Sequence, residues 1–501
     1  MAVVLVLLLL TVIIGLLLLW DRNRNKKLPP LAEGALPIIG HSMLAFISNE
    51  SLYEYLINNT VGASVKKGHE AVVIRLGTIE IFAVMNPDDA YVVANSCLKK
   101  DPLYQFFKPW SGDAGLITAD VPVWKRHRKL LNPAFNQSVL DTFLTEFNDQ
   151  SRRMITNLDQ EVGKGFFDQL PYVKHMMLEL VCATIMGVDV KEKAIIEKAG
   201  EAFVMFTKCT VKRIQKFWYH SDTLYAYSNL KKEQYAAAKI FQELSYEVLK
   251  KKKECFVANN DSSNQRKEPI KSRYKSFLDL VLELSNNEIL TEFEITEEVN
   301  TFIAAAFDTT YQTVGMTLLT LGSYPKVQQK VFEELQTVFD GTNRDVERND
   351  ISKLTYLEAV IKETMRLYPV VFLLGRTLDM NLNLKNYTLP KGSRCFASIY
   401  HVNRHSSWGA DAEVFRPERW LDGSLPTNLN KAFASFGLGR RSCIGLTYAM
   451  MSLKTVLAHV LRRYRISGDV TQLVLSADVV VTPLSGHHIS IERREMSNGQ
   501  I

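Results

Sequence analysis

The chain has 501 residues, of which 47% are hydrophobic and 23% charged, and its formal net charge is +6. This composition excludes an intrinsically disordered protein, and the small charge excess is not that of a nucleic-acid-binding protein, which carries a concentrated basic surface. A membrane surface or an acidic protein partner suits it better. The six cysteines stand far apart without CxxC pairs, as in a reducing compartment.

The first twenty residues carry no charged side chain and are long enough to cross the ~30 Å hydrocarbon core of a bilayer as a helix. A cleaved signal peptide is the alternative, but its apolar region is normally ~7–15 residues with a cleavage site of small residues, whereas DRNRNKK follows here. Basic residues follow the segment and none precedes it, so the positive-inside rule places the rest of the chain in the cytosol. We therefore predict a transmembrane anchor over residues 1–20.

Residues 21–40 combine a basic patch with a proline-rich stretch, which we interpret as a hinge between the anchor and a body over residues 41–501. Within the body, residues 71–87 read as two strands with a turn near Gly77 and Thr78. Apolar residues at helical spacing predict a helix over 354–368 that Pro369 ends.

Two further segments complete the pattern. Residues 258–275 are polar and predict an exposed loop, and residues 479–494 read as a closing hairpin that turns at Ser485 and Gly486. Most other segments show helical spacing, and no Pro/Gly/Ser-rich linker divides the body. We expect one large domain that is mainly α, with small β-sheets at one side.

A lone cysteine stands in the stretch FGLGRRSCIG, residues 436–445. Cys443 comes just before an apolar run with helical spacing, so we place it at a helix N-terminus, where unpaired N–H groups and the helix dipole favour a thiolate. The neighbouring glycines permit a tight loop around a flat ligand, and Arg441 can pair with an anionic group on it. A buried, inert cysteine is the alternative.

Asp308 is the only charged residue between Glu298 and Lys326, inside a long helical run. Burying a carboxylate without a partner costs several kcal/mol, so its presence needs a reason. The residues alone leave two interpretations open: neighbouring hydroxyls satisfy it structurally, or it belongs to a proton relay.

The cysteine stretch resembles the heme-binding loop of the cytochrome P450 family, whose pattern is matched by Phe436, Gly439, Arg441, Cys443 and Gly445. The resemblance implies a cytochrome P450 fold in which the cysteine is the axial thiolate of heme iron.

The helix around Asp308 resembles the oxygen-binding helix of that family, where an acid-threonine pair lies over the heme. Asp308 and Thr309 match this pair, and the resemblance implies that they are catalytic and help to deliver protons. Ala306 stands where the family usually has glycine, a departure that bears on how the groove takes up oxygen and water.

A further motif is matched by Glu363 and Arg366, with Arg419 in the segment FRPERW as a third member. Taken alone, Glu363 and Arg366 would be a helical ion pair on a solvated face. The resemblance implies instead a buried, structural network around the heme-binding loop.

Trp124 and Arg128 match the family's Trp-x-x-x-Arg, which contacts a heme propionate, and Arg376 and Arg441 are plausible companions. A solvated basic helix face is the alternative for this segment. The neighbouring basic residues Lys125, Arg126 and Lys129 are expected to form such a face, which could also receive an acidic electron-donor protein.

The chain is most similar to the animal branch of the family that contains fatty-acid ω-hydroxylases and many insect enzymes. Members of that branch that attach heme covalently use a glutamate where this chain has Ala305, so the resemblance implies non-covalent heme b. It also implies a monooxygenase of the endoplasmic reticulum membrane that receives electrons from NADPH through NADPH–cytochrome P450 reductase, with cytochrome b5 as a second candidate donor.

Two rival functions stay open at this point: a heme-thiolate isomerase or dehydratase that acts on a peroxide, and a membrane-anchored heme or lipid carrier. Residues 103–116 and 202–218 are the candidate substrate-contacting segments, and they indicate a lipophilic, partly aromatic lining. Fatty acids, terpenoids, pheromone-like volatiles and plant toxins all fit such a lining.

Overall fold

The computed structural model describes residues 11–12, 15, 28–190, 193–262 and 276–494. Most of the expected anchor over 1–20, and residues 21–27 of the basic patch, lie outside these ranges. Within them, no helix combines the length and the apolar character that a membrane span requires. The proline-rich segment runs beside the first strand, because the Ala32 N–H donates to Val73 O and the Val73 N–H donates to Pro30 O.

Long helices make up most of the body, which confirms the expected mainly α fold with small sheets. They are α8 (Leu144–Leu158), α9 (Leu170–Thr184), α10 (Lys193–Gln215), α12 (Asn229–Ser262), α14 (Glu292–Ser323), α15 (Pro325–Phe339), α17 (Thr355–Leu367) and α20 (Leu446–Arg463). α12 takes in residues 258–262 of the expected polar loop, and residues 263–275 lie outside the described part of the chain.

Shorter helices connect these. They are α2 (Asn49–Glu54), α3 (Gly62–Lys66), α4 (Pro87–Ser96), α5 (Lys108–Ser111), α6 (Val121–Leu131), α7 (Gln137–Leu140), α11 (Asp222–Ala226), α13 (Phe277–Asn286), α16 (Arg348–Lys353), α18 (Ile399–Val402) and α19 (Leu429–Ala432). Four of them, α2, α5, α6 and α18, contribute residues to the cavity described below.

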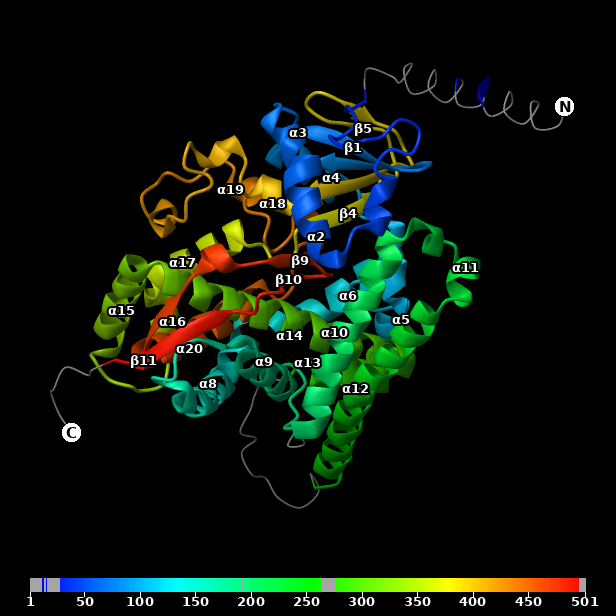
Figure 1. Ribbon diagram of the computed structural model, residues 1–501. Helices are drawn as coiled ribbons and strands as arrows, with labels where there is room; N and C mark the ends of the chain where they lie inside the picture. Colours follow the sequence, from blue (N-terminus) through cyan, green and yellow to red (C-terminus); the bar gives the residue numbers. More distant parts are fainter. Residues whose placement is uncertain (1–10, 13–14, 16–27, 191–192, 263–275, 495–501) are drawn as a thin grey trace.

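α14 is the central element of the body, with α9, α12, α17 and α20 packed around it (Figure 1). It begins at a capping box, in which the Thr291 side chain and the Glu294 side chain each accept from the other's backbone N–H. From Ile295 onward nearly every side chain is buried, so the helix supplies a rigid wall through the core.

The main sheet lies at the N-terminal side of the body and has the strand order β1-β2-β7-β4 (Figure 1). Its strands are β1 (Ala71–Leu76), β2 (Ile79–Val84), β7 (Arg394–Ser398) and β4 (Leu373–Thr377). β1 and β2 are antiparallel and turn at Gly77 and Thr78, as predicted; Gly77 has φ +59°, which favours glycine. β2 pairs with β7 in parallel.

Three smaller sheets complete the fold. They contain β3 (Phe167–Asp168) with β11 (His488–Arg493) and β8 (Tyr464–Gly468), β9 (Leu475–Ala477) with β10 (Val481–Pro483), and β5 (Leu382–Asn383) with β6 (Thr388–Leu389).

The predicted closing hairpin over 479–494 is wrong. β10 pairs with β9, and β11 pairs with β8 and β3, so the two strands belong to different sheets. The chain does bend at Gly486, with φ +72°, but the bend carries it from one sheet to the next. Alternating β-branched residues mark a strand without specifying its partner, which here lies upstream in both cases.

Candidate active site: a cysteine facing an apolar cavity

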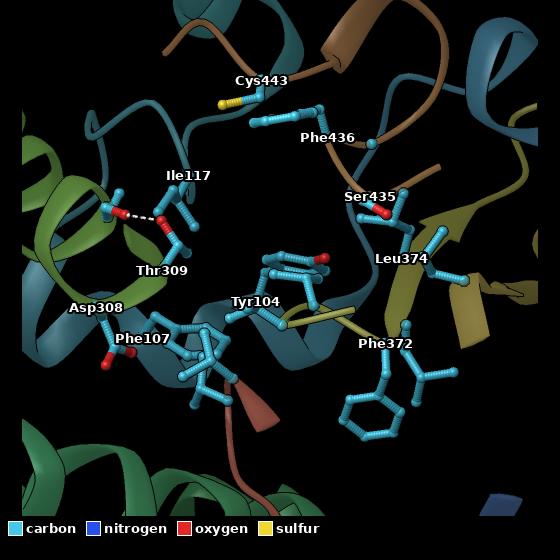
Figure 2. A pocket seen from close by; sticks show the side chains of 18 of the residues that line it. Tyr104, Phe107, Ile117, Asp308, Thr309, Phe372, Leu374, Ser435, Phe436 and Cys443 are labelled. Carbon is cyan, nitrogen blue, oxygen red and sulfur yellow. Dashed lines mark hydrogen bonds between the residues drawn. The ribbon is translucent and has the colours of Figure 1, made fainter. Parts of the chain in front are cut away.

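A cavity of about 580 Å³ lies between α14, the cysteine stretch, the main sheet and the β9–β10 turn. Aromatic and aliphatic side chains form most of its lining, including Tyr104, Phe107 and Phe372 (Figure 2). This matches the expected lipophilic, partly aromatic lining, and it is the setting in which small-molecule sites are usually found.

Cys443 lies at one end of this cavity, just before α20, which confirms its expected place at a helix N-terminus. Its N–H donates to Phe436 O at 2.8 Å, which closes the loop, and the exposed side of the thiol faces the cavity. Burial raises the pKa of the thiol and outweighs the hydrogen bond from Gly445 and the charge of Arg128. Contrary to our expectation, the protein alone therefore does not favour the thiolate.

Two glycines before the cysteine have conformations that favour glycine. Gly437 and Gly439 have φ +79° and +65°. A Cβ on Gly439 would also lie 2.8 Å from the backbone of Asn95, so only glycine fits there. At Gly445 φ is negative and a Cβ would meet only the Cys443 sulfur at 3.8 Å, so no steric requirement for glycine exists there.

Arginines predicted at the site gather around this loop. Arg128 Nη1 donates to Ser442 O at 3.0 Å, and Arg441 Nη2 donates to Ala119 O at 3.1 Å. The Arg441 guanidinium lies 4.4 Å from the Trp124 ring centroid, a cation–π contact. Arg376 is buried, and its Nη1 donates to Gly375 O.

Sequence reasoning missed a further cation, Lys100, which lines the cavity with Nζ 4.0 Å from the Tyr104 ring centroid. Burial and the charges of Arg376 and Arg441 hold its pKa well below the usual range. We call Lys100, Arg376 and Arg441 the cationic cluster. In the sequence, Lys100 looks like its exposed neighbour Lys99, and only tertiary burial separates the two.

Several donors of the cationic cluster are unused. Within the part of the chain that the structure describes, Arg376 Nε and both Nε and Nη1 of Arg441 are buried without a hydrogen-bond partner. Buried donors rarely lack a partner, and a buried charge needs a counter-charge. The cluster therefore suits an anionic group on a ligand that also reaches Cys443.

Asp308 and Thr309 occupy neighbouring positions on α14 and point in different directions. The Thr309 hydroxyl donates to Ala305 O at 2.8 Å, and both residues line the cavity. The Asp308 carboxylate points away from Cys443 (Figure 2) and accepts a hydrogen bond from Tyr311.

The environment of Asp308 changes its proton affinity. Burial raises its pKa to about 7, the negative charge of Asp478 adds to this, and Lys174 and Tyr311 oppose it. Asp478, in the β9–β10 turn, is a second cavity-lining carboxylate that sequence reasoning missed, because it is a single acidic residue before the apolar Val479 and Val480 and belongs to no motif.

Glu363, Arg366 and Arg419 come together as predicted, and all three are fully buried. Arg366 makes two hydrogen bonds to the Glu363 carboxylate at 2.9 Å, and Arg419 Nε donates to the same carboxylate at 2.9 Å. Trp420 Nε1 and the Arg416 N–H each add a hydrogen bond at 3.0 Å. Every carboxylate oxygen is thus satisfied more than once.

This buried ion pair reaches the cysteine stretch through one asparagine. Arg366 Nη1 donates to Asn403 O at 2.9 Å. The Asn403 side chain in turn donates to Ser435 Oγ and accepts from the Ala434 N–H, both at 2.9 Å. The residues just before Phe436 are therefore fixed by the Glu363 network.

Comparisons with known proteins agree with this geometry. A family model described as Cytochrome P450 matches residues 29–488. Cytochrome P450 4V2 of Mus musculus is 29% identical over 486 residues, which cover 95% of this chain and 91% of that protein. Cytochrome P450 4g1 of Drosophila melanogaster is 30% identical over 520 residues with the same shares, and cytochrome P450 4c3 of that species is 27% identical over 502 residues, with shares of 96% and 92%.

Replacing Glu363 should strongly destabilise the fold. In Glu363→Ala the buried Arg366 loses its counter-charge and Arg419 keeps only the partly exposed Asp411, so we expect the free energy of unfolding to fall by ~3–5 kcal/mol. Chemical denaturation followed by tryptophan fluorescence measures this. Glu333→Ala on the exposed face of α15 is the control, with an expected change within ~0.5 kcal/mol. Equal stability of the two variants would contradict a buried network.

Asp308→Asn should be more stable than the parent chain, by an amount that depends on pH. The folded-state pKa lies at about 7 against a usual 3.8. The stability that protonated Asp308 contributes is therefore present below about pH 4 and lost as pH rises to about 7. We expect the advantage of Asp308→Asn to grow across this window to ~2–4 kcal/mol and then level off. Denaturation curves at several pH values test this, and a pH-independent difference would contradict it.

Proposed function

The chain belongs to the cytochrome P450 family of heme monooxygenases, and we propose that it inserts one oxygen atom of O2 into a lipophilic small molecule, with electrons that a separate reductase takes from NADPH. One observation supports the proposal most directly. The Cys443 thiol faces an apolar cavity, and the cationic cluster lies at the same end of that cavity. The catalytic body would be residues 41–501.

The residues at the site fit heme b. Cys443 would bind the iron, and the cationic cluster with Trp124 and Arg128 would bind the two propionates, which supply the counter-charge that the buried guanidinium donors lack. Phe436, Gly439 and Gly445 of the same loop would help to hold the cofactor at the Cys443 end of the cavity. When bound, heme supplies the iron chemistry that activates O2. The Ala305 methyl cannot form an ester, so we propose that heme is held without a covalent link.

Asp308 and Thr309 would manage the protons of the reaction. With a pKa of about 7, the Asp308 carboxyl is present both protonated and ionised near neutral pH, which suits a group that takes up and releases a proton. Thr309 presents its Oγ1 at the cavity wall one residue away. We propose that rotation of the Asp308 side chain brings its proton from the Tyr311 side to the cavity.

The electron donor would be NADPH–cytochrome P450 reductase, with cytochrome b5 as a second donor. Lys125, Arg126 and Lys129 are exposed on α6, and Arg128 of the same helix contacts Ser442 beside the cysteine. An acidic partner bound to this face would lie close to Cys443. An N-terminal anchor over 1–20 would hold the protein on the endoplasmic reticulum membrane with the body in the cytosol.

The charges around the cavity support an uncharged substrate. The cations that line it (Lys100, Arg128 and Arg441) lie at the Cys443 end, whereas its lining carboxylates are Asp308 and Asp478. Propionates would occupy the cations, and a carboxylate substrate would then be buried close to Asp478 and a partly ionised Asp308 without a cation of the lining to pair with, which is costly. We propose that the substrate is a neutral lipophile.

The thiolate assignment is tested by the carbon monoxide spectrum of the reduced, heme-loaded protein. The parent chain should show the red-shifted Soret maximum of thiolate ligation, and Cys443→Ala should lose it because the iron has lost its sulfur ligand. Cys209→Ala, which removes a buried thiol elsewhere, should keep it. Absence of the red-shifted band from the parent chain, or an undiminished band in Cys443→Ala, would contradict the proposed function.

The substrate charge is tested with two ligands of equal chain length. Spin-state titrations should show dodecan-1-ol binding at least about tenfold more tightly than dodecanoate, since only the latter buries a charge. Asp478→Asn should strengthen dodecanoate binding several-fold and leave the alcohol unchanged, while Glu333→Gln alters neither. Dodecanoate affinity equal to that of the alcohol would contradict a neutral substrate.

A further inference from the structure

A fully buried histidine joins two elements of the site. His127 lies on α6 directly before Arg128, and its side chain has no exposed surface. Its Nδ1 lies 2.7 Å from Oε1 of Glu298 on α14, and its Nε2 lies 3.3 Å from Oε1 of Glu294. Glu298 is fully buried as well, so α6 and α14 are connected by a pair with no solvent around it.

The same carboxylate holds a wall of the cavity. The Leu116 N–H donates to Oε2 of Glu298 at 3.2 Å, and the Ala114 N–H donates to Oε2 of the neighbouring Glu297 at 2.5 Å. We call residues 112–118 the wall segment, because Leu116 and Ile117 line the cavity (Figure 2).

The wall segment lies directly on α14, with no room between the two. A Cβ on Gly115 would lie 2.3 Å from Thr301 Oγ1, and a Cβ on Gly112 would lie 1.7 Å from Glu297. Trp110 Nε1 donates to Asn300 O at 3.2 Å just before the segment. The position of the wall therefore depends on hydrogen bonds to carboxylates of α14.

We propose that His127 is a positioning residue for the reaction: through Glu298 it holds the wall segment against α14 and so sets how the substrate lies relative to Cys443. This inference rests on the proposed function, since it concerns the orientation of a substrate in the same cavity. Both oxygens of the Glu298 carboxylate take part: Oε1 contacts the imidazole and Oε2 accepts from the Leu116 N–H. Without His127, the buried Glu298 carboxylate must take up a proton or bind a water molecule. Either change alters its hydrogen bond to the Leu116 N–H and so the position of the wall segment.

The proton affinities agree with a charge-assisted pair. Burial acts to lower the pKa of His127, but Glu298 and Glu294 outweigh it and raise that pKa. Burial raises the pKa of Glu298, and the charge of Glu297 adds to this. Among the described residues, Arg126 also faces the imidazole, with its Nη2 3.1 Å from Nε2, and it pairs with Glu294 as well. The pair contributes where Glu298 is ionised and His127 protonated, that is above the raised pKa of Glu298, and the wall should loosen as pH rises through the raised pKa of His127.

The experiment compares variants of the full-length, heme-loaded protein. The double variant His127→Leu/Glu298→Leu replaces the ion pair by apolar side chains, an exchange that buried pairs often tolerate. His127→Asn retains a donor near the position of Nδ1. The control is His175→Leu/Glu179→Leu, which removes a half-buried histidine–glutamate pair on α9, where the two side chains lie 3.2 Å apart.

Two measurements are made on each variant. Hydrogen–deuterium exchange reports on the wall segment, and spectral titrations with imidazole and 1-phenylimidazole compare a small with a bulky iron ligand. In the double variant we expect exchange over 112–118 to be at least about tenfold faster, and the affinity ratio to shift at least about threefold toward the bulky ligand. His127→Asn and the control should stay close to the parent chain.

Parental exchange and a parental affinity ratio in the double variant would overturn the inference, and so would parental values in His127→Leu, which removes the imidazole alone and leaves Glu298 in place. If the double variant does not fold, the same two measurements are made on Glu298→Gln, and parental exchange with a parental affinity ratio again overturns the inference. A parent chain that lacks the red-shifted carbon monoxide band would instead count against the proposed function, and the exchange of the wall segment would still report on the role of His127.

Discussion

The buried carboxylate of Glu363 is the constraint on which the site depends. It accepts hydrogen bonds from Arg366 and Arg419. Arg366 also donates to Asn403 O, and the Asn403 side chain hydrogen-bonds the residues just before Phe436. Phe436 O in turn accepts the Cys443 N–H. The desolvation free energy of these buried charges is larger than the stabilisation that most single interactions provide. The network is therefore better understood as specifying one loop conformation than as a source of stability.

The distribution of charge gives the cavity two unlike ends. Cations gather beside Cys443, carboxylates lie along α14 and the β9–β10 turn, and apolar side chains separate them. In this low-dielectric space each charge acts over a longer range than it would in water. The cations can therefore fix the direction of an anionic cofactor by charge as well as by shape, while α14 supplies a wall whose side chains are mostly buried in the core.

The parts of the site that sequence could predict are those with local patterns. The cysteine stretch, the acid-threonine pair and the Glu-x-x-Arg turn each place their residues within one loop or one helical turn, so spacing alone indicates them. Lys100, His127 and Asp478 have no such pattern, since each is a single polar residue whose role arises from burial by distant segments. The pairing of β10 and β11 escaped prediction for the same reason, because a strand's partner is a tertiary property. The pKa of Cys443 likewise depends on burial, which the helix N-terminus alone does not reveal.

At Gly486 the chain passes from one sheet to another, so β10 and β11 follow each other in sequence but do not pair. β10 belongs to the hairpin whose turn lines the cavity, whereas β11 is tied to β8 and β3 next to the core, and the fully buried His487 stands between them. Among the described residues, no ladder of backbone hydrogen bonds joins β10 to β11, so a shift in the hairpin is not passed on through strand pairing. Substitutions in the β9–β10 hairpin can therefore reshape the cavity while β11 keeps its register with β8 and β3.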